Sequence, residues 1–522
     1  GKNLIIIGEN RETTIIDGNS IGRVVNMAGS ESILSNFTIQ NGTGSETVRG
    51  SGIYAAGNDI LNNLIVKNNT NTSGWGAGIT LGGISNGIDK PILKNSIIID
   101  NNGDGIVCDG GNSEIDNVTV ANNSMAGIYL RPNAGNAHPT VINSIIYGNL
   151  DNHQLVVGQP NSSYNNGIDI SYSLVQEGQD SIVATLNDTI NWGSGNIDVD
   201  PLFADTASGD YRLLALSPAI NAGHPDSTDL DGSRADMGGY PYLNTFVGPV
   251  WYVDSTNGSN ITGTGSSFNS FANIGPAIRF AADGDSINVA AGTYLENIDF
   301  DGKNIVMIGA GPGLSIIDGD TDGDGTGDGS VVTFDSGESS AAVLSGFTIQ
   351  NGHASNGGGM YFSLSNPTLT NLTVSGNTSE YGNGGGMYLT GSNPTITNVT
   401  ISGNTVGQAT NTGGGIYCAD ASNPVLLNTI LWDNGPNEVS FGETGNSNSI
   451  TISYSDIQGG QDSIATNDNG TVTLGAGNID VDPMFVDTEN GDFSLQRISH
   501  LIDSGHPDST DLDGTRADIG AY

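Results

Sequence analysis

One short acidic stretch of the sequence has the residue types and the spacing to bind a metal ion. It reads DGDTDGDGTGDGS and begins at Asp318. Carboxylates at every second residue can converge on one hard cation, and the glycines between them allow the chain to turn around it. The spacing therefore predicts a calcium site, whose four ligands would be Asp320, Asp322, Asp324 and Asp328.

This stretch resembles the early positions of EF-hand and thrombospondin type 3 calcium loops. The twelfth position, a bidentate glutamate in an EF-hand, is Val331 here, so the resemblance implies weaker binding. A flexible acidic turn is the alternative, because residues 321–329 are an insertion relative to the related first half of the chain. Asp318 is a further candidate ligand, but it aligns with Asp17, which has no such insertion beside it, so a structural turn residue is the alternative.

A second acidic motif, STDLDG followed by a further aspartate, occurs near the end of each half of the chain. A cation site is one interpretation of it. We prefer a turn that seals the end of each half, because a structural element is expected in both copies whereas a catalytic site need not recur. The residues are Asp229, Asp231 and Asp236, then Asp511, Asp513 and Asp518, preceded by His224 and His506.

The segments that carry these residues are repeated along the chain. Residues 365–435 contain one pattern three times, each copy beginning Ser-Asn-Pro, with a period of 27 to 30 residues. A fixed period of this size predicts a solenoid in which each repeat is one coil.

Each coil has room for three short strands separated by asparagine and glycine. In one coil these are PTIT, VTIS and GGGIYC. Asparagine suits left-handed turn positions, and its side chains can stack into hydrogen-bonded ladders, in one of which we expect Asn398. Alternation along the strands predicts four inward side chains, Ile396, Val399, Ile401 and Ile416.

A longer duplication divides the chain into two units. KNLIIIG at Lys2 matches KNIVMIG at Lys303, and GHPDSTDLDG at Gly223 is repeated letter for letter at Gly505. We expect unit one at 1–245 and unit two at 246–522, the latter with a cap at about 250–300, coils at about 301–475 and a closing Asp-rich segment at about 476–522.

Only the second unit shows a capping element. Residues 269–282 have helical spacing, with Phe271, Ile274, Ile278 and Ala281 on one face and Asn273 or Ser270 as the N-cap. A helix there would cover the open edge of the first coil. The matching cap of unit one would precede residue 1, so we interpret the chain as a fragment of a longer polypeptide.

The composition is strongly acidic. There are 14 Lys and Arg against 56 Asp and Glu, a formal charge of −42. Such a surface repels nucleic acid and anionic membranes and fits poorly with polyuronate substrates. It suits a soluble extracellular protein, cation binding, or life at high salt. No apolar run is long enough for a membrane span. Cys108 and Cys418 lie in matching strands far apart in the stack, and we expect free buried thiols.

The coil pattern resembles the right-handed parallel β-helix repeats of the pectate-lyase-like superfamily. The opening WYVDSTNGSN of unit two is similar to the N-terminal signature of bacterial members, and the segments from Gly195 and Gly477 resemble the bacterial choice-of-anchor Q domain. The resemblance implies an all-β, right-handed parallel β-helix solenoid with two tandem units, from a bacterial surface or secreted protein. Many activities occur on this scaffold.

The catalytic patterns of the pectinolytic relatives are missing from the sequence. Cleavage of the pectate-lyase kind needs calcium and an arginine or lysine base, and hydrolysis needs two carboxylates at a fixed separation. No Asp-Asp dipeptide and no Gly-His-Gly occur. His353 lacks a basic neighbour, and Arg131 with His138 form the one basic cluster near an aromatic residue. We assign no catalytic residue and favour a protein that is not an enzyme.

Tyrosines recur once per coil at Tyr361, Tyr388 and Tyr417. Alternation points them outward, which predicts an aromatic ladder that stabilises the sheet; carbohydrate contact is the alternative.

Together these features predict an extracellular structural or adhesive repeat protein, a stiff acidic rod or fibre whose partners are other copies or further units of the same chain. The alternative is a polysaccharide-binding or polysaccharide-cleaving β-helix protein, either a lyase or a hydrolase.

Overall fold

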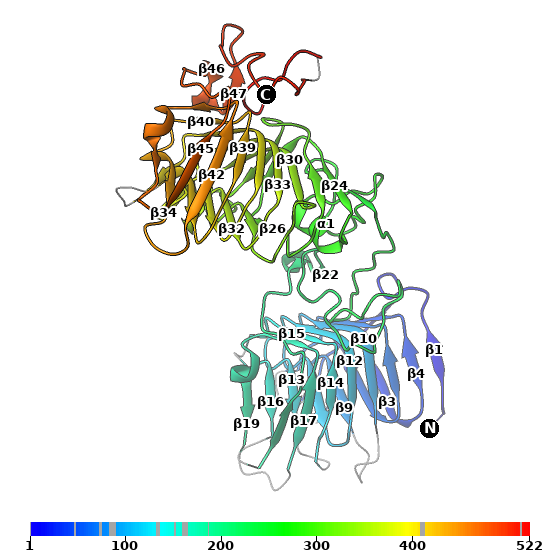
Figure 1. The fold of residues 1–522 in the computed structure, drawn as a ribbon. Helices are drawn as coiled ribbons and strands as arrows, with labels where there is room; N and C mark the ends of the chain where they lie inside the picture. The colour runs from blue at the N-terminus through cyan, green and yellow to red at the C-terminus, as the bar shows by residue number, and fades with distance from the viewer. Residues whose placement is uncertain are drawn as a thin grey trace. The chain divides into compact units, whose positions relative to one another are not determined.

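Short strands follow one another around each coil, and the strands of one coil pair with those at the same place in the next coil (Figure 1). The computed structural model describes residues 2–522 except 46–47, 72–75, 83–89, 132–135, 151–152, 159–164, 186, 408–412 and 512–513. The chain folds into two units, Gly1–Thr245 and Phe246–Tyr522.

Unit one contains two long parallel sheets and one hairpin among its described residues. The first sheet is formed by β1 (Ile5–Ile7), β2 (Ile15–Asp17), β4 (Ile33–Ser35), β5 (Thr38–Gln40), β7 (Ile60–Asn62), β8 (Ile65–Lys67), β10 (Ile92–Ile99), β12 (Glu114–Ala121), β14 (Thr140–Ile142), β15 (Ile145–Tyr147), β17 (Gly167–Ser171), β18 (Leu174–Val175) and β20 (Thr189–Trp192). The second is formed by β3 (Val25–Ser30), β6 (Ile53–Gly57), β9 (Ile79–Gly82), β11 (Ile106–Asp109), β13 (Ile128–Leu130), β16 (Leu155–Val157) and β19 (Ile182–Ala184). The hairpin is β21 (Phe203–Asp205) with β22 (Asp210–Leu213).

Unit two repeats this arrangement with a third, short parallel sheet. Its first sheet is formed by β23 (Val250–Val253), β24 (Ser286–Val289), β25 (Gly292–Leu295), β27 (Val306–Ile308), β28 (Ser315–Asp318), β30 (Val343–Gln350), β33 (Thr368–Ser375), β36 (Thr395–Ser402), β39 (Val425–Leu427), β40 (Ile430–Trp432), β42 (Asn448–Ser453), β43 (Asp456–Ile457) and β45 (Gly470–Leu474). The second is formed by β26 (Ile298–Asp299), β29 (Val332–Phe334), β32 (Met360–Ser363), β35 (Met387–Thr390), β38 (Gly413–Ala419), β41 (Asn437–Phe441) and β44 (Ile464–Ala465). The third is β31 (His353–Asn356), β34 (Thr378–Asn383) and β37 (Thr405–Val406), and the hairpin is β46 (Phe485–Asp487) with β47 (Asp492–Leu495).

The predicted fold class, a parallel β-helix solenoid, is confirmed. Pairing between coils is parallel throughout the long sheets, as in β33 with β36, where Leu369 lies beside Ile396 and Val374 beside Ile401. The hairpins β21–β22 and β46–β47 are antiparallel. Within the described residues, no helix is long and apolar enough to cross a membrane.

Left-handed asparagines decide which side chains enter the core. Asn398 in the middle of β36 has a φ of 52°. This bend interrupts the two-residue alternation, so Ile396 before it and Val399 and Ile401 after it all point inward. These three residues and Ile416 are fully buried, as the sequence predicts.

A second set of asparagines forms the buried ladder. The amide of Asn377 donates to Oδ1 of Asn404 over 2.9 Å, and that of Asn404 donates to Oδ1 of Asn434 over 2.9 Å. Asn398 lies in a separate ladder, as predicted: its amide donates to Oδ1 of Asn371 at 3.4 Å, and its Oδ1 accepts the amide of Asn428 at 2.9 Å. Asn398 is half-buried, whereas Asn377 and Asn404 are fully buried. Unit one has the equivalent ladder, formed by Asn69, Asn101, Asn123 and Asn149.

The predicted tyrosine ladder is present on the second sheet of unit two. Tyr361 and Tyr388 stack with ring centroids 5.5 Å apart, and Tyr388 and Tyr417 with centroids 5.7 Å apart. The two cysteines, Cys108 and Cys418, are free and buried, as predicted, and burial raises the pKa of both thiols.

The capping helix α1 (Ile274–Phe280) is shorter than the predicted 269–282. Asn269 forms a β-bridge with Ser266, and Phe271 forms one with Val253. The helix therefore begins only after Asn273. The predicted apolar face, which includes Phe271, is buried all the same.

The closing segment of each unit runs back along the side of the coils. In unit one the backbone N–H groups of His224 and Gly238 donate to the side-chain and backbone oxygens of Asn143. In unit two His506 and Gly520 make the same two bonds to Asn428. The segment covers a lateral face several coils long, rather than sealing the end of the stack as we expected.

Candidate functional site

The acidic loop of unit two follows β28 and is anchored by Asp318. This carboxylate accepts hydrogen bonds from the amides of Gln350 at 2.8 Å and Asn351 at 2.9 and 3.0 Å, both in the next coil. Asp17 of unit one receives the same two bonds from Gln40 and Asn41. The position thus serves the turn in both units, with or without the inserted loop.

Three of the four predicted ligands lie together in the loop. Asp320, Asp322 and Asp328 each place a carboxylate oxygen within 4.8 Å of the other two, and no second group of this kind occurs in the described parts of the chain. Asp324 is outside the group; its carboxylate accepts the backbone N–H of Thr326 over 2.8 Å.

The carboxylate of Asp320 is only half satisfied by the protein. Its Oδ2 accepts the N–H of Gly325 over 3.0 Å, whereas its Oδ1 is shielded from solvent and has no hydrogen-bond partner among the described residues. A shielded carboxylate oxygen without a partner is costly, and a cation would relieve that cost. Hydrogen bonds from the side chain and backbone of Thr321 lower the pKa of Asp328, which favours the charged form that a metal ion needs.

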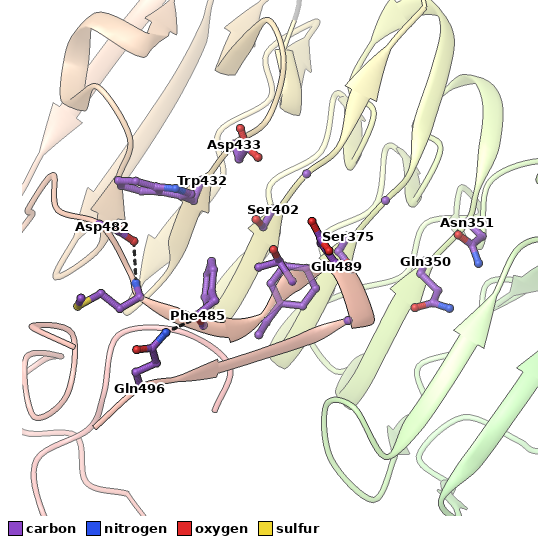
Figure 2. A pocket seen from close by; sticks show the side chains of 16 residues that line it. Gln350, Asn351, Ser375, Ser402, Trp432, Asp433, Asp482, Phe485, Glu489 and Gln496 are labelled. Carbon is purple, nitrogen blue, oxygen red and sulfur yellow. Dashed lines mark hydrogen bonds between the residues drawn. The ribbon is translucent and has the colours of Figure 1, made fainter. Parts of the chain in front are cut away.

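A groove lies between the first sheet of unit two and the hairpin β46–β47, and we call it the hairpin groove (Figure 2). Its volume is about 700 Å³. The lining residues come from four successive coils and from the segment that forms the hairpin: Gln350, Asn351, Ser375, Gly376, Ser402, Gly403, Trp432, Asp433, Asp482, Met484, Phe485, Thr488, Glu489, Gly491, Phe493 and Gln496.

The floor of the hairpin groove is a row of side chains in register. Gln350 pairs with Ser375, Ser375 with Ser402, and Ser402 with Trp432 in the parallel ladder. The opposite wall carries Phe485, whose ring packs edge-on against Phe493 with centroids 5.3 Å apart. The groove therefore runs across the coils, with amide and hydroxyl groups on its floor and aromatic rings at one end.

The charges in the hairpin groove are all negative. Asp433, Asp482 and Glu489 are exposed, and the lining contains no lysine, arginine or histidine. Oδ1 of Asp482 accepts the N–H of Met484 over 2.8 Å, which fixes that carboxylate at the base of the hairpin.

Unit one has the equivalent groove with different chemistry. It measures about 430 Å³ and lies beneath β21–β22, with Phe203 and Tyr211 where unit two has Phe485 and Phe493. At three positions unit one lacks a charged or polar side chain of unit two: it has Gly148, Ala207 and Leu214 where unit two has Asp433, Glu489 and Gln496. It also has Tyr147 where unit two has Trp432.

Our sequence analysis missed the hairpin groove. The closing segment lies about fifty residues beyond Trp432 in sequence, and nothing in the local patterns indicates that it folds back over the coils. The available signal was the pairwise difference between the units, because Asp433 and Glu489 stand in matching segments where unit one has Gly148 and Ala207.

The STDLDG aspartates bind the backbone of their own segment. In unit one Asp229 accepts the N–H of Asp236 at 2.8 Å, and Asp236 accepts those of Asn221 at 2.7 Å and Tyr242 at 2.6 Å. Burial raises the pKa of Asp236 to about 7. The carboxylate of Asp231 accepts hydrogen bonds from the backbone N–H groups of Ser233 and Asn244.

Unit two repeats the part of this network that the structure describes. Asp511 accepts the N–H of Asp518 at 3.0 Å, and Asp518 accepts that of Asp503 at 2.7 Å; Asp513 lies outside the described residues. These contacts favour the structural interpretation of the motif.

The basic residues considered as catalytic candidates are dispersed. His138 pairs with Asp169 at 3.2 Å on the outside of unit one. His353 lies in β31, beside a separate small cleft next to the acidic loop.

Comparison with known proteins bears on the fold. A search of curated proteins finds no match to the chain. A family model described as "Right handed beta helix region" matches residues 330–480, which contain the coils from β29 to β45. This match supports the right-handed parallel β-helix repeat family for the coils of unit two.

Proposed function

We propose that the protein is a structural or adhesive scaffold on the outside of a bacterial cell, a stiff acidic rod whose partners are further units or other copies of the same chain. The observation that supports this proposal most is that the same architecture occurs in both units. Both units have the same two long parallel sheets, a buried asparagine ladder and a lateral closing segment. In each closing segment the backbone N–H of a histidine, His224 or His506, donates to an asparagine of the coils. An array of load-bearing units requires such repetition, whereas a single active site does not.

Two further features support an exterior, extended role. The net charge of −42 keeps an exposed surface soluble and opposes binding to nucleic acid. Coil-to-coil pairing leaves few strand edges unpaired, and the backbone of the coils is poorly accessible to proteases.

Immunogold labelling of cells that produce the full-length gene product tests the scaffold. Antibodies against unit two should label fibres or the outer surface of intact cells. Label found only inside permeabilised cells would contradict the proposal.

We also propose that the acidic loop binds calcium through Asp320, Asp322 and Asp328. The shielded Oδ1 of Asp320 supports the assignment, as does the fit of an all-oxygen donor set to a hard cation. The ion would fix the loop beside Asn351 and so stabilise this edge of unit two.

The hairpin groove favours a second function, polysaccharide binding. An open groove with amides, hydroxyls and aromatic rings is suited to a chain of sugars. The described lining carries carboxylates but no lysine, arginine or histidine, so binding rather than base-assisted elimination is the function it supports.

A further inference from the structure

We propose that the hairpin groove of unit two binds a linear glycan that carries free amino groups. The proposal deepens the second function above and does not depend on the scaffold or on calcium.

The shape of the hairpin groove fits an extended chain. With neighbouring strands about 4.8 Å apart, the three coil-to-coil steps from Gln350 to Trp432 span roughly 14 Å. Beside this row the floor is open at Gly376 and Gly403, because a Cβ atom added at either position would meet no atom within 4 Å. A trough of this length across the coils suits several sugar residues in line rather than one small molecule.

The floor and the end wall offer the contacts that a sugar chain uses. The amide of Gln350 and the hydroxyls of Ser375 and Ser402 can donate to and accept from ligand hydroxyls. Trp432 follows in the same register and is half-buried, so its indole is held in place while part of it faces the groove. A flat apolar ring next to a polar row can pack against the apolar face of a pyranose.

The charge of the hairpin groove selects an amine. Asp433, Asp482 and Glu489 place three carboxylates around the trough, and the lining has no positive charge to balance them. An anionic glycan would be repelled, whereas protonated amino groups would be attracted and could also contact the indole face. Bound metal does not explain the three carboxylates, because the one place where described acidic residues converge tightly is the loop at Asp320.

The comparison of the two units separates binding chemistry from fold. Unit one keeps the hairpin and its aromatic packing but has Gly148 and Ala207 in place of Asp433 and Glu489. The acidic residues are therefore unnecessary for docking the hairpin. They are free to serve a ligand in unit two.

The test measures binding of a glucosamine hexamer to the full chain by isothermal titration calorimetry. The wild-type chain should bind it at one site with an affinity that falls as salt is raised. Three other hexamers serve as comparisons. The hexamer of N-acetylglucosamine is neutral, the hexamer of galacturonate is anionic, and the hexamer of lysine is a basic peptide. All three should bind more weakly than the glucosamine hexamer.

The variants are designed from the other unit, so that folding is preserved. D433G/E489A, which copies unit one, should weaken binding roughly tenfold and remove most of its salt dependence. W432A should weaken glucosamine binding to a similar extent. Conversely, Y147W/G148D/A207E in unit one should raise the number of hexamers bound per chain from one toward two. The backbone tolerates an aspartate at position 148, where φ is 68°, because Asp433 has a similar φ of 60° in unit two.

Three results would overturn the proposal. Absence of glucosamine-hexamer binding to the wild type would do so, as would equal binding of the neutral hexamer. The third is a lysine hexamer that binds as tightly as the glucosamine hexamer, with an affinity that W432A does not change. That result would assign the groove to basic peptides. None of these results bears on where the protein is located or on whether it forms fibres.

Discussion

Single polar residues hold this core together where apolar packing is interrupted. Asn404 is fully buried; its amide donates to Oδ1 of Asn434 at 2.9 Å and to the carbonyl of Val374 at 2.9 Å, while its Oδ1 accepts two bonds from Asn377. Each ladder asparagine satisfies groups of its own coil and of the next coil. The ladder thus replaces the water that a buried turn would otherwise need.

We expect Asn404→Ala to lower the free energy of unfolding by about 2–3 kcal/mol, because it leaves the buried backbone N–H of Asn377 without an acceptor and removes the amide bonds of Asn404 to Val374 and Asn434. Chemical denaturation of the full chain measures this. The control is Asn393→Ala, in an exposed stack, which should cost less than about 0.5 kcal/mol. Equal effects of the two substitutions would refute the special role of the buried ladder.

Two buried acids distinguish unit two from unit one. Burial raises the pKa of Glu438 and of Asp456 to about 7, although hydrogen bonds from Asn434 and Val481 oppose the shift. Unit one has Gln154 and Leu174 at these positions. The neutral replacements show that the fold does not need a charge at either position.

These acids predict a pH dependence of stability. The folded chain keeps both protons up to about pH 7, whereas the unfolded chain loses them near pH 4, so their contribution to the free energy of unfolding falls as the pH rises between these values. E438Q/D456L, which copies unit one, should therefore be more stable than the wild type at pH 8 by about 2 kcal/mol or more and should differ less at pH 4. Urea unfolding at the two pH values checks this, and a difference that does not change with pH would contradict the assignment.

At the scale of elements, inserted segments modify a fixed coil. The strand β28 and the anchor at Asp318 match Asp17 and its strand in unit one, and the nine-residue insertion simply extends from that turn. Similarly, the hairpins β21–β22 and β46–β47 have the same backbone pairing but present different side chains to their grooves.

For the acidic loop we expect calcium to raise the melting temperature of the wild-type chain relative to EDTA, because binding to the folded state alone stabilises it by mass action. D320N/D322N/D328N should abolish the calcium-induced shift. Asp335→Asn, at an exposed position of the same unit, is the charge control and should preserve the shift. A wild-type melting temperature that is unchanged by calcium would rule out a structural site.

At the scale of the molecule, duplication followed by divergence explains the arrangement of features. The two units share sheets, ladders and closing contacts, while the acidic loop, the buried acids and the acidic groove belong to unit two. The scaffold function depends on what the units share. The calcium and glycan proposals depend on features that only unit two has.

The sequence by itself determined the solenoid, the inward residues Ile396, Val399 and Ile401, the tyrosine ladder and the free thiols, because these follow from a period that each coil repeats locally. It also located the acidic loop, since the aspartates of the loop are close neighbours in the chain. Only the tertiary structure excluded Asp324 from the converging group and showed that the fully buried ladder runs through Asn404, separate from the half-buried ladder of Asn398. Only the structure showed the hairpin groove, because Trp432 and Glu489 are brought together by a segment that folds back across the coils, and no local pattern encodes that contact.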